Sequence, residues 1–221
     1  MSVQADLQKL GNKEKAAFVA RYFKTGKGEY GEGDVFLGIT VPAQRIVAKK
    51  YKDLSISEIE KLLHSQIHEH RLTGFMILAR RNPSKEIYDF YLAHTDRINN
   101  WDLVDSSAQI VGEYVLDKDR SILRTLAKSK SLWERRIAIV ATHTFIKQKD
   151  FAMTFKVAEL LMGDTHDLIH KAVGWMLREV GKRDQKAEEK FLQKHYKTMP
   201  RTMLRYAIER FSVSKRVFYM G

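Results

Sequence analysis

The sequence contains no cysteine. This absence excludes a disulfide-stapled scaffold, a zinc site built on thiolates and a cysteine nucleophile, and it agrees with a reducing compartment. Long apolar runs are also missing, since none approaches the ~18 residues that a membrane span needs. The first residues, Met1 to Asp6, lack the apolar core of a signal peptide. We therefore expect a soluble, cytoplasmic protein.

Proline is scarce, with three residues in 221, and apolar residues recur at spacings of three and four. This pattern predicts an almost entirely helical chain. Pro42 marks the start of one helix, Ser55 and Glu58 have the spacing of a capping box, and Asn82 and Asp164 are candidate helix caps. The other predicted helices cover residues 4–24, 56–65, 67–81, 84–94, 102–116, 118–128, 132–147, 150–162, 166–182, 185–196 and 201–211. The basic tail around residues 214–219 reads as a capping or fraying end.

One segment breaks the helical pattern. Residues 26–33 hold four of the twelve glycines, and such a stretch cannot be a helix. It predicts either a flexible surface loop or a short β-hairpin near residues 26–36, with Lys27 and Tyr30 at its tip.

Several helices share a short pattern that starts with a charged residue. Arg71, Asp105, Arg136, Lys171 and Arg205 occupy corresponding positions, and consecutive members are 31 to 35 residues apart. A repeat of this length with two helices per unit is typical of an α-solenoid. We therefore predict a single domain over residues 1–221, whose inner helices line a concave basic groove.

The charge balance suggests a polyanionic partner. Lys and Arg total 39 against 27 acids, a formal net charge of +12, and nucleic acid is the commonest partner of such a protein. In a DNA groove the carboxylate of Asp105 would repel phosphate and weaken binding. Its presence there therefore indicates either a specific function for Asp105 or neutralisation by a neighbour such as Arg136. Trp101 shares its helix face at spacing i, i+4. Trp133 reads as core packing, whereas Trp101 and Trp175 could either pack internally or flank Asp105 at the surface.

Taken together and in order, four motifs resemble the AlkD-like DNA glycosylases, all-helical proteins with HEAT-like repeats that remove alkylated purines. The motifs are Phe36-Leu37-Gly38-Ile39 with Pro42 and Arg45, Trp101-Asp102-x-Val104-Asp105-Ser106, Trp133 with Arg136, and Lys171-Ala172-x-Gly174-Trp175-x-Leu177-Arg178-Glu179. The resemblance covers nearly the whole chain. It implies an α-solenoid of antiparallel HEAT-like helix pairs that binds double-stranded DNA.

Matched residue by residue, the resemblance implies that Asp105 is the catalytic carboxylate. Trp101 and Trp175 would hold the deoxyribose and backbone of the lesion, and Arg136 and Arg178 would grip nearby phosphates. Arg71, Lys171, Arg205, Lys27 and Tyr30 are further candidate DNA contacts. The expected activity is monofunctional excision of cationic N3- or N7-alkylated purines without a base-binding pocket, with the carboxylate stabilising an oxocarbenium-like sugar.

The sequence is also compatible with two other functions. The glycine-rich segment looks like an insertion relative to the glycosylases, and the resemblance to relatives with such extra elements implies a non-catalytic protein that binds branched DNA. Helical repeats also serve as protein-interaction scaffolds. His64, His68 and His70 with Glu69 suggest a metal site, but the HExxH pattern is absent, so we expect no metal and no cofactor. We expect a monomer that associates with the nucleoid when bound to DNA.

Overall fold

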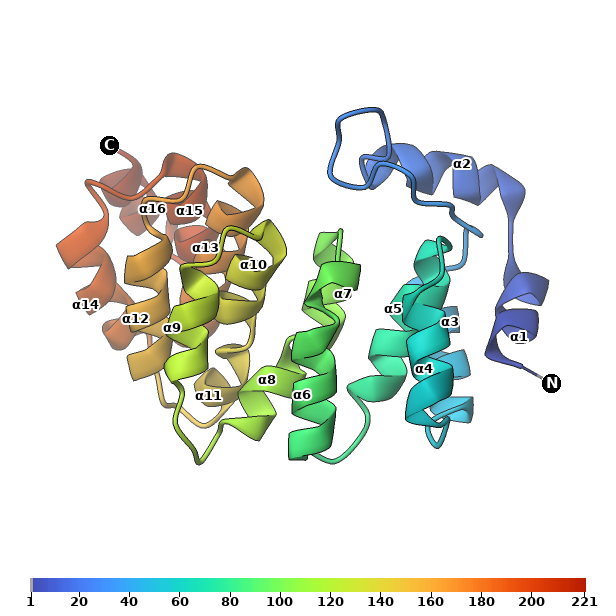
Figure 1. The fold of residues 1–221 in the computed structure, drawn as a ribbon. Coiled ribbons are helices and arrows are strands. Elements are labelled where there is room, and N and C mark those ends of the chain that lie inside the picture. The colour runs from blue at the N-terminus through green and yellow to red at the C-terminus, as the bar shows by residue number, and fades with distance from the viewer. Residues whose placement is uncertain (1) are drawn as a thin grey trace. The chain divides into compact units, whose positions relative to one another are not determined.

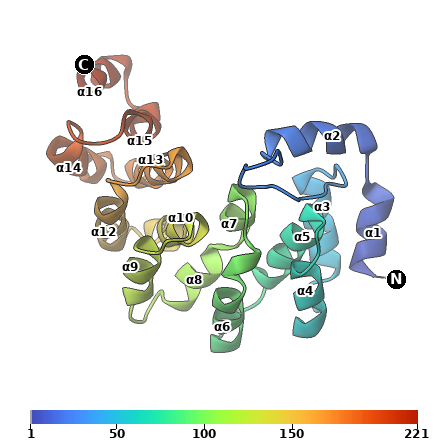
Figure 2. The ribbon, with the colours of Figure 1, turned by 45° about the horizontal axis from the view of Figure 1, so that its top comes forward.

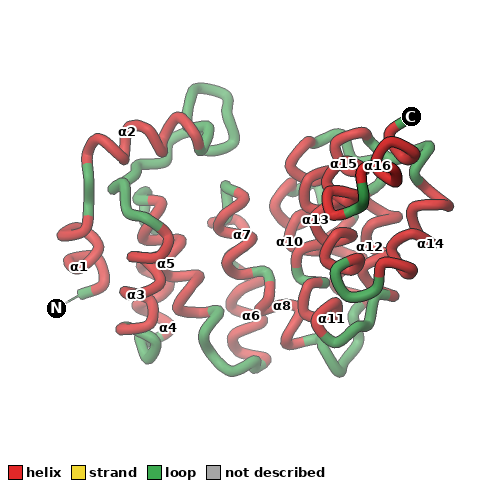
Figure 3. The backbone as a smooth tube through the Cα atoms, turned by 180° about the vertical axis from the view of Figure 1, so that it is seen from behind, coloured by secondary structure: helices red, strands yellow, loops and turns green. Residues whose placement is uncertain are grey.

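The computed structural model describes residues 2–221, and it is all-helical over them (Figures 1 and 3). The only β-type feature in that range is an isolated parallel bridge between Val35 and Ile67. The helices are α1 (Val3–Leu10), α2 (Lys13–Tyr22), α3 (Val41–Lys50), α4 (Ile56–Leu63), α5 (His68–Leu78), α6 (Lys85–Ala93), η1 (Thr95–Arg97), α7 (Trp101–Ser107), α8 (Gln109–Tyr114), α9 (Ser121–Ala127), α10 (Leu132–Val140), α11 (His143–Lys147), α12 (Ala152–Leu161), α13 (Asp167–Gly181), α14 (Gln185–His195), α15 (Arg201–Ala207), η2 (Ile208–Arg210) and α16 (Val213–Met220).

The prediction of an almost entirely helical chain is confirmed, but three long helices are each divided in two. Residues 4–24 form α1 and α2, because Asn12 starts a new helix by accepting a hydrogen bond from the Lys15 amide at 2.9 Å. Residues 102–116 divide into α7 and α8, and residues 132–147 into α10 and α11. Periodicity alone does not register such breaks, because the apolar face continues across them.

The predicted caps have mixed outcomes. The capping box of Ser55 and Glu58 is present at the start of α4. The predictions for Asn82 and Asp164 are wrong, because Ser84 caps α6 and His166 caps α13. Asp164 instead accepts hydrogen bonds from Arg135 and from the His166 amide. The basic tail is not a frayed end but the helix α16.

The chain divides into two compact units, residues 1–110 and 111–221, and the prediction of one domain stays untested. In the first unit, α5 packs against α3, α4 and α7. Every residue of α5 is buried, so this helix forms the centre of that unit.

In the second unit the helices form two layers. Helices α10, α13 and α15 are packed side by side, and α9, α12 and α14 form the other layer (Figure 2). Each pair of consecutive helices contributes one member to each layer, as expected for an α-solenoid. Lys171 lies on α13 and Arg205 on α15, so both belong to the first of these layers.

The glycine-rich segment does not form the hairpin that the sequence suggested. Residues 25–33 make successive turns, and the chain closes on itself where the Gly31 amide donates to the Lys24 carbonyl at 2.9 Å. A Cβ on Gly31 would lie 2.6 Å from the Phe23 carbonyl oxygen, so only glycine allows this closure. The Asn100 side chain also donates to the Phe23 carbonyl at 3.0 Å, which fixes the segment to the start of α7.

Candidate functional site

Helix α7 carries the two residues on which the sequence prediction depends. Trp101 is its first residue and Asp105 lies one turn later, so the indole and the carboxylate share one face. Both side chains are partly exposed. Asn100, the N-terminal cap of α7, is fully buried, and its side-chain oxygen accepts a hydrogen bond from the Trp101 amide at 3.0 Å.

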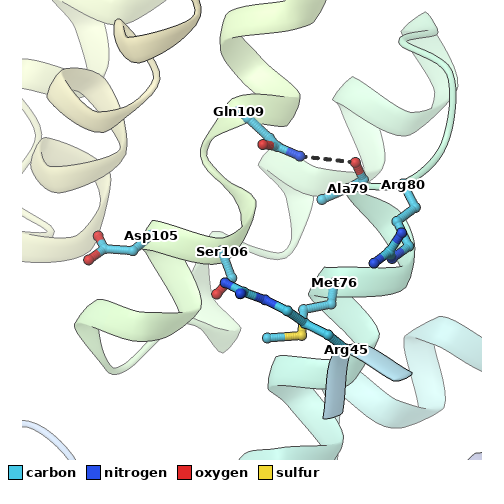
Figure 4. Close-up of a pocket in the computed structure, with 7 residues that line it drawn as sticks. All are labelled: Arg45, Met76, Ala79, Arg80, Asp105, Ser106 and Gln109. Carbon is cyan, nitrogen blue, oxygen red and sulfur yellow. Dashed lines mark hydrogen bonds between the residues drawn. The ribbon is translucent and has the colours of Figure 1, made fainter. Parts of the chain in front are cut away.

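Asp105 lies at the edge of a pocket of about 460 Å³ within the first unit (Figure 4). Two exposed arginines line it, Arg45 from α3 and Arg80 from the residues that follow α5. The carboxylate of Asp105 points away from both guanidinium groups (Figure 4). The remaining lining residues are Met76, Ala79, Ser106 and Gln109, and the Gln109 amide donates to the Ala79 carbonyl at 3.1 Å.

Asp105 lies close enough to a buried tyrosine of the first unit to influence its pKa. Tyr91 on α6 is fully buried, and its hydroxyl pairs with the Ser107 hydroxyl at 3.0 Å. Burial raises the pKa of the Tyr91 phenol, and the nearby charge of Asp105 raises that pKa further.

Trp101 is held by an aromatic stack. Its ring lies parallel to Phe23, with 5.2 Å between the centroids and 11° between the planes, and Phe23 in turn stacks on Phe36 at 5.4 Å. Phe36 also stacks on the His68 imidazole at 4.6 Å. Because stacked aromatic pairs have defined geometry, the position of the indole is fixed by residues on three separate segments.

A buried network of charged side chains joins these segments. His68 binds Asp34 through Nδ1 at 2.9 Å and Asp102 through Nε2 at 2.8 Å. Asp34 also accepts hydrogen bonds from Arg71 at 2.6 Å and from Asn99 at 2.8 Å. The glycine-rich segment, α5 and the start of α7 are therefore connected by ionic hydrogen bonds, which are stronger than neutral ones.

The network determines the charge of His68. Burial alone would lower the pKa of the imidazole, but the charges of Asp102 and Asp34 and their hydrogen bonds outweigh it and raise the pKa to about 9. The partners of Asp34 also outweigh burial. Burial would raise the pKa of this carboxyl, but its hydrogen bonds and the charge of Arg71 lower it. His68 is therefore a cation between two carboxylates at neutral pH.

Glu69, the neighbour of His68 in the sequence, orders the backbone of the first sequence motif. Glu69 accepts hydrogen bonds from the amides of Leu37, Gly38 and Ile39 at 2.9, 2.8 and 3.2 Å. Gly38 has a φ of +79°, and a Cβ there would lie 2.2 Å from the Asn12 carbonyl oxygen. Glu69 and His68 are thus structural residues, and His70 binds the Ser65 hydroxyl at 2.9 Å instead of joining them.

In the second unit, Trp175 is a partly exposed residue of α13. Its indole N–H donates to Glu179 at 3.3 Å, and its ring lies 6.4 Å from His143. Burial would raise the pKa of Glu179, but hydrogen bonds from Lys182 and Arg183 lower it below its usual value. An ionised Glu179 therefore fixes the orientation of the indole. Trp133 is buried, which confirms its prediction as a core residue.

The predicted DNA-binding cations have very different environments. Arg71 and Arg136 are 6% and 5% exposed, and Arg136 donates to the Leu168 carbonyl at 2.6 Å. This burial favours a structural role for both over contact with phosphate. Arg178 is mostly buried and pairs with Glu209, whereas Lys171 is more open and pairs with Asp167 at 2.6 Å. Arg205 and Lys27 are exposed, and Tyr30 is partly buried.

The family model described as "DNA alkylation repair enzyme" matches residues 3–211. The chain belongs to this family. No helix between residues 2 and 221 combines the length and the apolar character needed to cross a bilayer.

The solved structures that resemble the chain include the following two. One is described as a predicted DNA alkylation repair enzyme from Enterococcus faecalis, with 18% identity and a TM-score of 0.77 over 92% of this chain and 97% of that one. The other is AlkD2 from Streptococcus mutans, with 19% identity and a TM-score of 0.56 over 89% of this chain and 97% of that one. At these identities the matches establish the fold, and they confirm the predicted all-helical, HEAT-like class. A search of the curated proteins found no match.

Sequence reasoning did not assign two features of this DNA alkylation repair family member. Arg80 was not among its candidate contacts, although an Arg pair at the end of an apolar helix is a visible signal. The network of Asp34, His68 and Asp102 was also missed, although these residues are separated by 34 positions each. That interval equals the spacing of Arg71 and Asp105, so the repeat itself contained the signal.

Proposed function

We propose that the protein is a DNA glycosylase that excises cationic N3- or N7-alkylated purines from duplex DNA. The observation that carries this proposal is the shared face of Trp101 and Asp105 on α7, at the edge of a pocket that also contains Arg45 and Arg80. A carboxylate, an aromatic ring and two cations are the groups needed to hold a sugar between phosphates and to stabilise positive charge on it.

The chemistry requires little from the protein beyond electrostatics. An alkylated purine carries a positive charge, so heterolysis of the glycosidic bond gives its electron pair to the base and releases the base as a neutral molecule. The positive charge then develops on C1′ and the ring oxygen of the deoxyribose. The carboxylate of Asp105 stabilises that charge, and water adds to C1′ and loses its proton to solvent.

We assign DNA binding to the cations that are exposed, and not to every charged residue that recurs at the 31- to 35-residue spacing. Arg45, Arg80, Lys171 and Arg205 reach the surface of their units, and the net charge of +12 favours phosphate contacts that do not depend on sequence. That Trp175, Arg136 and Arg178 also contact the DNA near the lesion stays a prediction.

The test is release of free base from a duplex that contains 7-methylguanine, measured in single turnover. Asp105→Asn should lower the rate by about 10²–10³-fold, the usual effect of removing one electrostatic stabiliser. Binding to undamaged duplex should be equal or tighter, because the variant removes a charge that repels phosphate. The matched control is Asp53→Asn, which changes an exposed carboxylate in the same unit and should leave the rate unchanged.

Normal excision by Asp105→Asn would contradict the proposal. Failure of the wild-type protein to release base, together with salt-dependent duplex binding, would instead support a non-catalytic DNA-binding protein. In that case affinity for a four-way junction should be compared with affinity for linear duplex, for the wild type and for a variant lacking residues 27–33.

A further inference from the structure

Three potential metal ligands converge at the C-terminal ends of two helices, away from the residues that line the Asp105 pocket. Glu60 and His64 lie one turn apart on α4, and His64 is the C-terminal cap of that helix. His94 caps the C-terminal end of α6. One ligand atom from each of the three side chains can be chosen so that all lie within 4.8 Å of one another.

The ring of His94 is already oriented for coordination. Its Nδ1 pairs with the Phe90 carbonyl at 2.7 Å, and its ring lies against the Phe90 ring with 4.2 Å between centroids. A carbonyl only accepts, so Nδ1 carries the proton and the lone pair of the neutral ring is on Nε2. That atom lies 3.4 Å from Oε1 of Glu60. A backbone partner on the second ring nitrogen is the usual support of a metal-binding histidine.

The distances suit a small transition-metal ion. Ligand atoms about 2.0–2.2 Å from a tetrahedral Zn²⁺ ion lie roughly 3.3–3.6 Å from each other. The Glu60–His94 pair already has this separation, and the ligand atom of the exposed His64 lies within 4.8 Å of both. Two imidazoles and one carboxylate select zinc-like ions over Mg²⁺ or Ca²⁺, which prefer sets of oxygen ligands.

We propose that Glu60, His64 and His94 form a binding site for a zinc-class divalent ion, which links the ends of α4 and α6 and leaves a coordination position for water. In the sequence, His64 stands close to His68 and His70. The structure separates His64 from those two residues and places it beside His94, which is thirty positions away. The site is independent of the proposed glycosylase activity.

The chain supplies a matched control. His195 and Glu159 form a similar pair, with Nε2 and Oε1 3.2 Å apart. Among residues 2–221, only the Glu60, His64 and His94 group brings three such ligands together. If a third ligand is what makes the site, the His195 pair should contribute no comparable affinity.

The experiment is calorimetric titration of chelator-treated full-length protein with ZnCl₂, without DNA. The wild type and His195→Gln should bind one ion with equal affinity, while His94→Gln and Glu60→Gln should each weaken binding at least about tenfold. Thermal unfolding should shift upward with zinc in the wild type and return on addition of EDTA. Circular dichroism of each variant without metal establishes that it is folded.

Absence of a one-to-one complex in the wild type would overturn the proposal. Equal affinity in His94→Gln and the wild type would overturn it as well. If one variant does not fold, the other decides the outcome, because each removes a different ligand from a different helix. Visible absorption of the Co²⁺-loaded protein provides a separate readout of nitrogen ligation, and it should be lost in His94→Gln.

Discussion

Two carboxylates on α7, three residues apart, have opposite surroundings. Asp102 is 6% exposed, and its oxygens are occupied by the imidazole of His68 and by the Leu103 amide. Asp105 is partly exposed and lies at the edge of an open pocket that Arg45 and Arg80 also line. The difference shows how one helix can use the same functional group twice. A buried carboxylate between fixed partners holds elements together, whereas a partly exposed one beside a pocket can also be reached by a ligand.

The largest expected effect comes from breaking the buried side of this comparison. Arg71→Met removes a guanidinium that donates to Asp34, Asn99 and the Ser65 carbonyl, and it leaves the carboxylate of Asp34 buried with weaker compensation. Loss of one partner from a buried ion pair costs about 3–5 kcal/mol. Urea unfolding should show this loss. Arg80→Met, at the pocket, should stay within about 0.5 kcal/mol of the wild type, and equal losses in both variants would remove the distinction.

A second prediction uses pH to separate the two regions. The pKa of His68 is raised from an ordinary value of 6.5 to about 9 in the folded state. Its contribution to stability is therefore complete below pH 6.5 and is lost as the pH rises through 9, by at most about 3 kcal/mol. Unfolding free energies measured from pH 6 to 9.5 should fall accordingly. Asp102→Asn should flatten this dependence because it removes a partner of the imidazole, whereas Asp105→Asn should not change the slope.

The smallest expected effect concerns the arginines of the pocket. Arg45→Ala and Arg80→Ala should each weaken duplex binding by a few-fold and reduce the slope of log K against log salt by about one, as expected for the loss of one phosphate contact. Lys52→Ala, an exposed cation of the same unit outside the pocket, is the control. If the slope of log K against log salt is unchanged in both arginine variants, the DNA does not contact this pocket.

Much of the fold could be predicted from the sequence because helical periodicity and proline scarcity act locally. The start of α3 at Pro42 and the capping box of α4 were predictable for this reason. The break at Asn12 was not, because a polar residue in the middle of a periodic segment can be either a surface position or a cap. The turns around Gly31 depend on a carbonyl from Phe23 and a side chain from Asn100, so they were hidden from local reasoning.

The candidate site was predictable to a similar depth. The spacing of Trp101 and Asp105 determines their common face, so a helix prediction is enough to place them together. The recurring charges were harder to interpret, because the repeat indicates equivalent positions but not burial. Arg71 and Arg136 share the pattern with Lys171 and Arg205, yet the first two are buried and the others are not. Only the packed neighbours, such as Asp34 for Arg71, distinguish a structural cation from a binding one.

We propose that Asp105 performs chemistry, whereas Asp102 stabilises the fold. The most direct measurement is base release from 7-methylguanine DNA, together with the urea midpoint, for Asp105→Asn and Asp102→Asn side by side. We predict that Asp105→Asn loses excision by about 10²–10³-fold at an unchanged midpoint, and that Asp102→Asn lowers the midpoint. A normal excision rate in Asp105→Asn, or a loss of stability in it equal to that of Asp102→Asn, would contradict the account.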